Sequence, residues 1–130
     1  MADLRLSPGV MFVGRYRIPD GKADAWRAAN REMTEYVEAN LPNTISFDAY
    51  LSEDGSEGTS VHIHRDAGSF DTYLAAAASP IGRGAQVVEV IRIDLYGAPN
   101  VETIERLRRM GSWPVGVHAH VNGFGHQDVT

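Results

Sequence analysis

The sequence predicts an α+β fold in which helices cover one face of an antiparallel sheet, and three observations lead to this prediction. Short runs that alternate apolar and polar residues, the pattern of half-buried strands, are interleaved with segments whose apolar residues recur at helical spacing. The chain has 130 residues, enough for one domain with its own core. Hydrophobic residues make up 43% of it and charged residues 22%, proportions typical of globular proteins. We therefore expect a single domain over residues 1–130, with a core of about 10–97 and a C-terminal extension of 98–130.

The first predicted elements are a strand and a long helix. Val10–Ile18 is predicted to be a strand in which both faces mix apolar and polar residues, and the Pro-Asp-Gly sequence at 19–21 favours a turn. A helix is predicted over about Lys22–Ala39, because apolar residues from Trp26 onward recur every three or four positions and most charged residues fall on the other side.

A β-hairpin is predicted next. Thr44–Ser52 carries mainly apolar residues on one face, and a polar loop at 53–58 connects it to a third strand. In that third strand Val61 and Ile63 share one face, and His62 and His64 share the other. Because a half-buried antiparallel sheet produces such alternation, we expect Val61 and Ile63 to face the helices.

The remaining core elements are a second helix and a fourth strand. Ser69 is a favourable N-cap for the helix, and Ser79-Pro80 is expected to end it before a loop at 81–85. Val87–Tyr96 is predicted to be the fourth strand, which gives the ferredoxin-like order βαββαβ. The extension adds a predicted helix at Val101–Met110 and a fifth strand at Trp113–Val121.

Helices on one face leave the other face of the predicted sheet uncovered. We expect a second copy of the chain to cover it in an isologous homodimer. The predicted uncovered face carries a polar group of six residues: Asp48, Tyr50, His62, His64, Arg92 and Asp94.

Charge and composition argue against several partners and cofactors. The net charge of −5 does not favour nucleic acid, which usually attracts a basic surface. No apolar run approaches the roughly 20 residues of a membrane span, and the N-terminal sequence does not resemble a signal peptide, so a cytoplasmic protein is expected. The absence of cysteine excludes thiolate metal sites, and the absence of a dinucleotide-binding fingerprint argues against a bound nicotinamide or flavin. We expect no cofactor and no metal.

Residues from about Gly14 to Gly97 resemble the antibiotic biosynthesis monooxygenase superfamily of dimeric α/β-barrel proteins. The resemblance lies in the strand ending Ile18-Pro19-Asp20-Gly21 with the helix after it, in Phe47–Leu51, in Phe70–Leu74 followed by Ser79-Pro80, and in Ile93–Gly97. It implies dimers whose sheets form a barrel, with a cavity between each sheet and its helices.

Known activities of the superfamily include cofactor-free oxidation of polycyclic phenols, haem degradation and isomerisation of small molecules. The haem-degrading branch carries Asn, Trp and His where this chain has Gly14, His64 and Tyr73, so haem degradation is not expected. The resemblance instead implies a cofactor-independent monooxygenase or oxidase that acts on an activated phenolic or polyketide-like small molecule. A non-catalytic dimer that binds a small molecule is the alternative.

The candidate catalytic group follows from the predicted polar face. His62 or His64 would be the base, oriented by Asp48, because imidazole exchanges protons near neutral pH. Arg92 would stabilise the substrate anion or peroxide. The candidate substrate-binding residues are Tyr50, Tyr73 and Trp26. The structural alternative is that the histidines are polar filling and that Arg92 and Asp94 form an ion pair.

A metal site is a further alternative. The two His-x-His pairs, His62 with His64 and His118 with His120, could supply imidazole ligands if their strands were neighbours, and His126 follows them.

Overall fold

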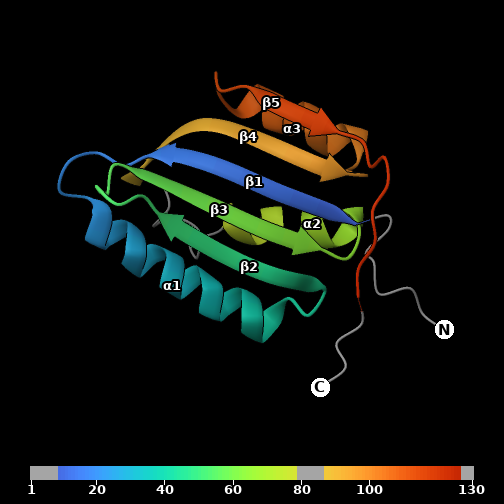
Figure 1. Ribbon diagram of the computed structural model, residues 1–130, viewed down its shortest axis with the longest axis horizontal. Coiled ribbons are helices and arrows are strands. Elements are labelled where there is room, and N and C mark those ends of the chain that lie inside the picture. The colour runs from blue at the N-terminus through green and yellow to red at the C-terminus, as the bar shows by residue number, and fades with distance from the viewer. Residues whose placement is uncertain (1–8, 79–86, 127–130) are drawn as a thin grey trace.

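A five-stranded sheet covered by three helices forms the part of the chain that the computed structural model describes, residues 9–78 and 87–126 (Figure 1). The architecture is the predicted ferredoxin-like α+β fold with a C-terminal helix and strand added. The predicted helix stop at Ser79-Pro80 and the predicted loop at 81–85 lie outside the described residues.

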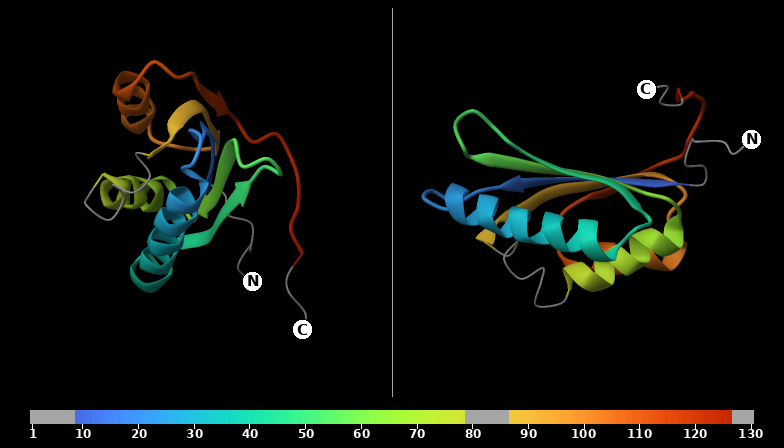
Figure 2. Two further views of the ribbon diagram at one scale, coloured as in Figure 1. Left: turned by 90° about the vertical axis from the view of Figure 1, so that its left-hand side faces the viewer. Right: turned by 90° about the horizontal axis from the view of Figure 1, so that it is seen from below.

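The order of the elements along the chain agrees with the prediction, with ends that differ by a few residues. They are β1 (Val10–Arg17), α1 (Ala23–Asn40), β2 (Thr44–Leu51), β3 (Glu57–His64), α2 (Ala67–Ala77), β4 (Glu89–Gly97), α3 (Val101–Met110) and β5 (Val115–His118). The strands lie in the order β2-β3-β1-β4-β5, and all neighbours are antiparallel except β4 and β5. The three helices lie on the same side of the sheet (Figure 2).

The core lies between the sheet and these helices. Phe12 of β1, Phe70 of α2 and Leu95 of β4 are among its most buried side chains. On α1 the buried residues Trp26, Met33 and Val37 recur at helical spacing, as expected for the side of a helix that faces a core. Among the described residues, no helix is long and apolar enough to cross a membrane.

The predicted orientation of β3 is wrong. His62 and His64 face the helices and are only 1% and 0% exposed, whereas Val61 and Ile63 lie on the open face. The register fixes this result, since His62 is opposite Phe12 on one side and Phe47 on the other. Alternation separates two faces but does not say which one is buried, and neutral imidazole rings can be buried among aromatic rings.

Helix α2 begins earlier than predicted because its N-cap is Asp66 and not Ser69. The Asp66 carboxylate accepts hydrogen bonds from the backbone N–H of Ser69 at 2.8 Å and from its hydroxyl at 2.6 Å. An aspartate at this position satisfies an N–H of the first turn that has no partner within the helix.

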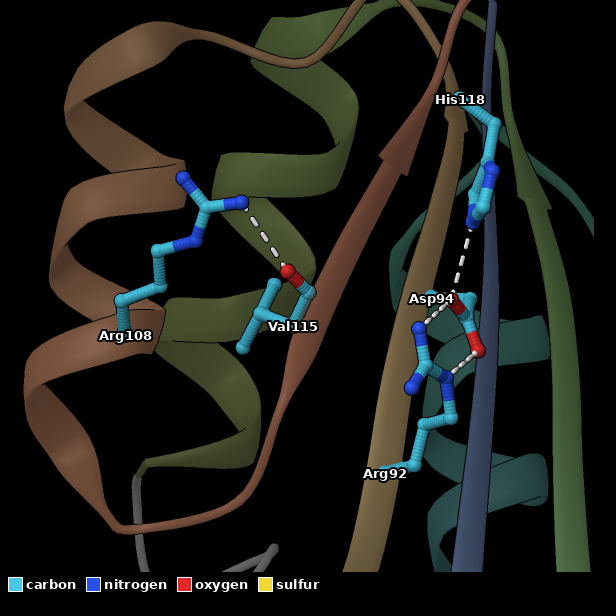
Figure 3. Close-up of polar contacts among 5 residues, drawn as sticks. All are labelled: Arg92, Asp94, Arg108, Val115 and His118. Carbon is cyan, nitrogen blue, oxygen red and sulfur yellow. Dashed lines mark hydrogen bonds and ion pairs between the residues drawn. The ribbon is translucent and has the colours of Figure 1, made fainter.

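The extension is joined to the core by polar contacts. Asp71 of α2 accepts hydrogen bonds from Asn100 at 2.8 Å and from the buried Thr103 at 2.5 Å, which fixes the start of α3. The Arg108 guanidinium donates to the Val115 carbonyl at 3.0 Å and so connects α3 to β5 (Figure 3). Strand β5 runs parallel to β4, as a strand reached through a crossover helix does.

Candidate functional site

A cavity of about 90 Å³ lies between the sheet and helices α1 and α2. Its walls come from β1, β2, β3, both helices and the segment before β4. The lining residues are Tyr16, Trp26, Ala29, Asn30, Met33, Phe47, Ser60, Tyr73, Ala77 and Val88. None of these described lining residues is charged, so the cavity suits an uncharged ligand.

Tyr16 reaches the cavity because Gly14 makes room for it. Both residues lie on the helix-facing side of β1, and a Cβ added at Gly14 would lie 2.3 Å from the Tyr16 hydroxyl oxygen. Burial raises the pKa of Tyr16, and a hydrogen bond with the Ser60 side chain offsets part of this effect. At neutral pH the phenol therefore keeps its proton and can donate it in a hydrogen bond.

Tyr73 contributes a second phenol from α2. Burial is the main cause that raises its pKa, and the neighbouring Tyr16 raises it further. Asn30 on α1 donates one amide hydrogen bond to the Trp26 carbonyl at 3.0 Å, which holds its side chain in place. The cavity thus offers several uncharged hydrogen-bonding groups to a ligand.

The two buried histidines lie next to this cavity without lining it. The His62 ring is stacked between Phe12 and Phe47, with centroid separations of 4.5 Å and 4.3 Å, and Tyr73 contacts it edge-on at 4.6 Å. Phe47 and Tyr73 both line the cavity, so His62 lies directly behind them.

His64 connects His62 to the start of β2. The His64 Nε2 atom is 3.4 Å from Nδ1 of His62, and its Nδ1 atom is 3.1 Å from the Thr44 hydroxyl. Burial lowers the pKa of His64 from 6.5 to about 4. Burial is the main cause that lowers the pKa of His62 well below 6.5, and the neighbouring His64 lowers it further. Both rings are therefore neutral at neutral pH.

The structure divides the predicted site residues between two faces. Trp26 and Tyr73 line the cavity, and His62 and His64 lie behind its wall. The other three, Asp48, Tyr50 and Arg92, lie on the open face. Each of them pairs with a residue of a neighbouring strand that lies on that face, and these partners are Val61, Thr59 and Arg15 in the same order. The predicted contact of Asp48 and Tyr50 with the histidines is therefore wrong, because β3 presents its other side to them.

Sequence reasoning missed Tyr16, Asn30 and Ser60 as cavity residues. For Tyr16 a signal was present, since a glycine two positions earlier on a strand leaves space on the same face. Asn30 and Ser60 gave no comparable signal, because their place at the cavity depends on how α1 packs on the sheet.

Arg92 takes part in a separate polar cluster on the open face (Figure 3). Its guanidinium contacts the two oxygens of Asp94 at 2.6 Å and 2.9 Å, and His118 Nε2 lies 2.9 Å from the same carboxylate. This pairing holds the pKa of Asp94 below its usual value, chiefly through the hydrogen bond from Arg92. The predicted alternative of an Arg92–Asp94 ion pair is thus what the structure contains.

The two His-x-His pairs do not come together. Strands β3 and β5 are separated in the sheet by β1 and β4, and His118 lies on the open face whereas His62 and His64 face the helices. Within residues 9–78 and 87–126 no three His, Cys, Asp or Glu side chains are grouped so as to hold a metal ion.

Comparison with known proteins identifies the family. Residues 9–79 match the sequence profile described as antibiotic biosynthesis monooxygenase, which is more than half of the chain. Among curated proteins none is similar enough in sequence to match.

Several crystal structures share the fold at low sequence identity. MupZ from Pseudomonas fluorescens is 17% identical with a TM-score of 0.72, and the match covers 94% of this chain and 98% of MupZ. SnoaB, a cofactor-independent oxygenase from Streptomyces nogalater, is 15% identical with a TM-score of 0.57, over 72% of this chain and 95% of SnoaB. Rv0793 from Mycobacterium tuberculosis is 18% identical with a TM-score of 0.54, over 71% and 96% of the two chains.

Proposed function

Because the chain belongs to the antibiotic biosynthesis monooxygenase family, we propose that it is a cofactor-independent monooxygenase that oxidises a small, activated phenolic or polyketide-like molecule. The observation that carries the proposal is the uncharged cavity between sheet and helices, with the phenols of Tyr16 and Tyr73 in its wall. SnoaB, which shares the fold, is a cofactor-independent oxygenase, and this likeness agrees with the proposal.

The reaction needs no external reductant. The substrate gives up a proton, and its anion transfers electrons to O₂ so that a carbon–oxygen bond forms. The resulting peroxide takes up a proton, the O–O bond breaks, and loss of a second hydrogen from the same carbon leaves a carbonyl group. One oxygen atom remains in the product and the other leaves as water, with both hydrogens and all electrons supplied by the substrate.

The residues of the cavity match the needs of the anionic steps. Tyr16 and Tyr73 keep their protons, because burial raises the pKa of each, and can therefore donate hydrogen bonds to a phenolate or enolate oxygen. Trp26 and Phe47 provide aromatic surface for a substrate ring. His62 contacts Phe47 and Tyr73 of the cavity wall and is neutral, so this imidazole is the proposed acceptor of the substrate proton.

The size of the cavity limits the substrate. Pockets for drug-sized ligands usually measure roughly 300–1,000 Å³, and this one measures about 90 Å³. The cavity therefore receives one ring or one end of the substrate, and a larger molecule extends beyond it.

Oxygen uptake with 1,8-dihydroxyanthrone as the probe tests the proposal. Purified protein is expected to accelerate O₂ consumption over spontaneous oxidation. Tyr16→Phe is expected to lower kcat about a hundredfold to a thousandfold, since it removes one hydrogen-bond donor to the anion. Tyr50→Phe is the matched control, because that phenol is 58% exposed on the open face. Equal activity of Tyr16→Phe and wild type would contradict the assignment of the cavity. Saturable binding of the probe without O₂ uptake would support the non-catalytic alternative instead.

We also propose that the protein is a homodimer whose subunits meet through their open sheet faces. The middle of this face carries Met11, Val13, Val61 and Ile63, all partly exposed in the single chain. The ion pairs Arg15–Glu57 and Arg17–Glu89 lie at one end of it. Such an apolar centre with a polar margin is typical of an interface between subunits.

Light scattering at micromolar concentration tests the dimer. We expect twice the 14.2 kDa mass of the chain for the wild type and a monomer for Val13→Glu. Val101→Glu, the same change at an exposed position of α3, is expected to leave the mass unchanged. A monomeric wild type would contradict this proposal without affecting the cavity.

A further inference from the structure

Three side chains form a continuous line from the beginning of β2 to the wall of the cavity. The Thr44 hydroxyl is 3.1 Å from His64 Nδ1, and His64 Nε2 is 3.4 Å from His62 Nδ1. We propose that Thr44, His64 and His62 form a proton relay that takes the substrate proton out of the cavity and returns it to the peroxide. This inference rests on the proposed function, which it deepens by giving the reacting proton a route.

Each contact in the line joins two atoms that can share one proton. If both imidazoles carry hydrogen on Nδ1, His62 donates to His64 and His64 donates to Thr44. If both carry it on Nε2, His64 donates to His62 and Thr44 donates to His64. The two arrangements use the same atoms and distances, so the hydrogen bonds along the line can point either way.

The surroundings of the rings favour transfer without a buried charge. The rings that contact His62 are Phe12, Phe47, Tyr73 and His64, and those that contact His64 are His62, Phe70 and Tyr73. These neighbours are uncharged, and burial lowers the pKa of both histidines. A neutral imidazole can accept a proton at one nitrogen while it releases another from the second, so neither ring has to remain charged.

The two ends of the line lie in suitable places. The inner end is Nε2 of His62, the nitrogen that does not face His64, and the His62 ring contacts Phe47 and Tyr73, which line the cavity. The outer end is Thr44, which is partly exposed on β2, the edge strand of the sheet. Water can therefore exchange protons with the hydroxyl of Thr44.

One turnover uses the relay in both directions. The substrate proton goes to Nε2 of His62, the Nδ1 proton of His62 goes to Nε2 of His64, and the Nδ1 proton of His64 goes to Thr44. The original hydroxyl proton of Thr44 passes to water. When the peroxide anion has formed, each proton moves one step back and protonates it, so both rings regain their first tautomer and no net proton is lost.

Nitrogen NMR of protein labelled with ¹⁵N-histidine tests the relay without any substrate. At pH 7 we expect both imidazoles to be neutral and to share one tautomer. Thr44→Val removes the hydroxyl at nearly constant shape, and we expect it to change the ring-nitrogen shifts of both His64 and His62. Thr72→Val is the matched control at an exposed position of α2 and should change neither. Opposite tautomers, a protonated imidazole, or an effect that stops at His64 would overturn the relay.

Kinetics separate this inference from the proposed function. With 1,8-dihydroxyanthrone, we expect Thr44→Val to lower kcat about a hundredfold and to leave KM unchanged, because Thr44 does not line the cavity. Unchanged kcat in a variant with normal folding would overturn the relay while the oxygenase proposal stands. If the wild type consumes no O₂ at all, the proposed function fails, and the NMR result alone decides whether the three groups are coupled.

Discussion

The stability of the protein should depend on pH through the burial of His64. This imidazole is 0% exposed, and its pKa in the folded protein is lowered to about 4. In the unfolded chain a histidine titrates near 6.5. Between these values the unfolded state binds more protons than the folded state, so the free energy of unfolding falls as the pH falls.

The size of the effect follows from the difference of about 2.5 pH units. At about 1.36 kcal/mol per unit, His64 contributes roughly 3 kcal/mol that is fully present above about pH 6.5 and fully lost below about pH 4. About 2 kcal/mol of this should be lost by pH 5 and about 3 kcal/mol by pH 4. His62 adds a loss of the same sign, since burial lowers its pKa as well.

Urea denaturation at a series of pH values measures this contribution. His64→Phe removes the titrating group and keeps an aromatic ring next to Phe70 and Tyr73, so its stability should fall less steeply between pH 7 and 4 than that of the wild type. The carboxylates are the same in both proteins, so their contribution to the pH dependence of stability cancels when the two slopes are compared. His126→Gln, at an exposed position, is the matched control and should retain the wild-type slope. Equal slopes for wild type and His64→Phe would refute the burial of a neutral imidazole on the helix side.

Three further predictions concern the cavity, the extension and the open face. Gly14→Ala should cost about 1–3 kcal/mol, measured by urea denaturation, because the new methyl group displaces the Tyr16 phenol; wild-type stability would show that the phenol lies elsewhere. Asp71→Ala should cost about 1–3 kcal/mol in the same assay, because it leaves the buried Thr103 hydroxyl without its acceptor; an unchanged midpoint would mean that α3 is held by its apolar contacts alone. Arg92→Ala should change the free energy of unfolding little, since the arginine side chain of this ion pair is 39% exposed. It should also leave kcat for 1,8-dihydroxyanthrone unchanged; a large loss of turnover would return Arg92 to the active site.

Much of the fold could be predicted because local patterns determine it. The spacing of Trp26 and the apolar residues after it specifies α1, and the turn residues at 19–21 separate it from β1. The extension was predicted as helix and strand for the same reason, and α3 has the predicted limits Val101–Met110. These features depend on neighbours in sequence, which a single chain displays directly.

The candidate site could be predicted only in part, because its geometry depends on contacts between distant segments. The alternation of Val61, His62, Ile63 and His64 fits burial of either face. The aromatic rings of Phe12, Phe47, Phe70 and Tyr73, which come from the three elements β1, β2 and α2, surround the histidines and decide which face is buried. The polar type of a residue does not decide which face it lies on, because imidazoles with hydrogen-bonding partners can be buried.

Turnover of 1,8-dihydroxyanthrone under ¹⁸O₂, with chelator-treated protein and no added cofactor, tests the central claim most directly. If the protein is a cofactor-independent monooxygenase, mass spectrometry should find one ¹⁸O atom in each product molecule, and Tyr16→Phe should form that product more slowly than Tyr50→Phe. Product oxygen that comes from water, or turnover that requires an added metal or flavin, would contradict the account.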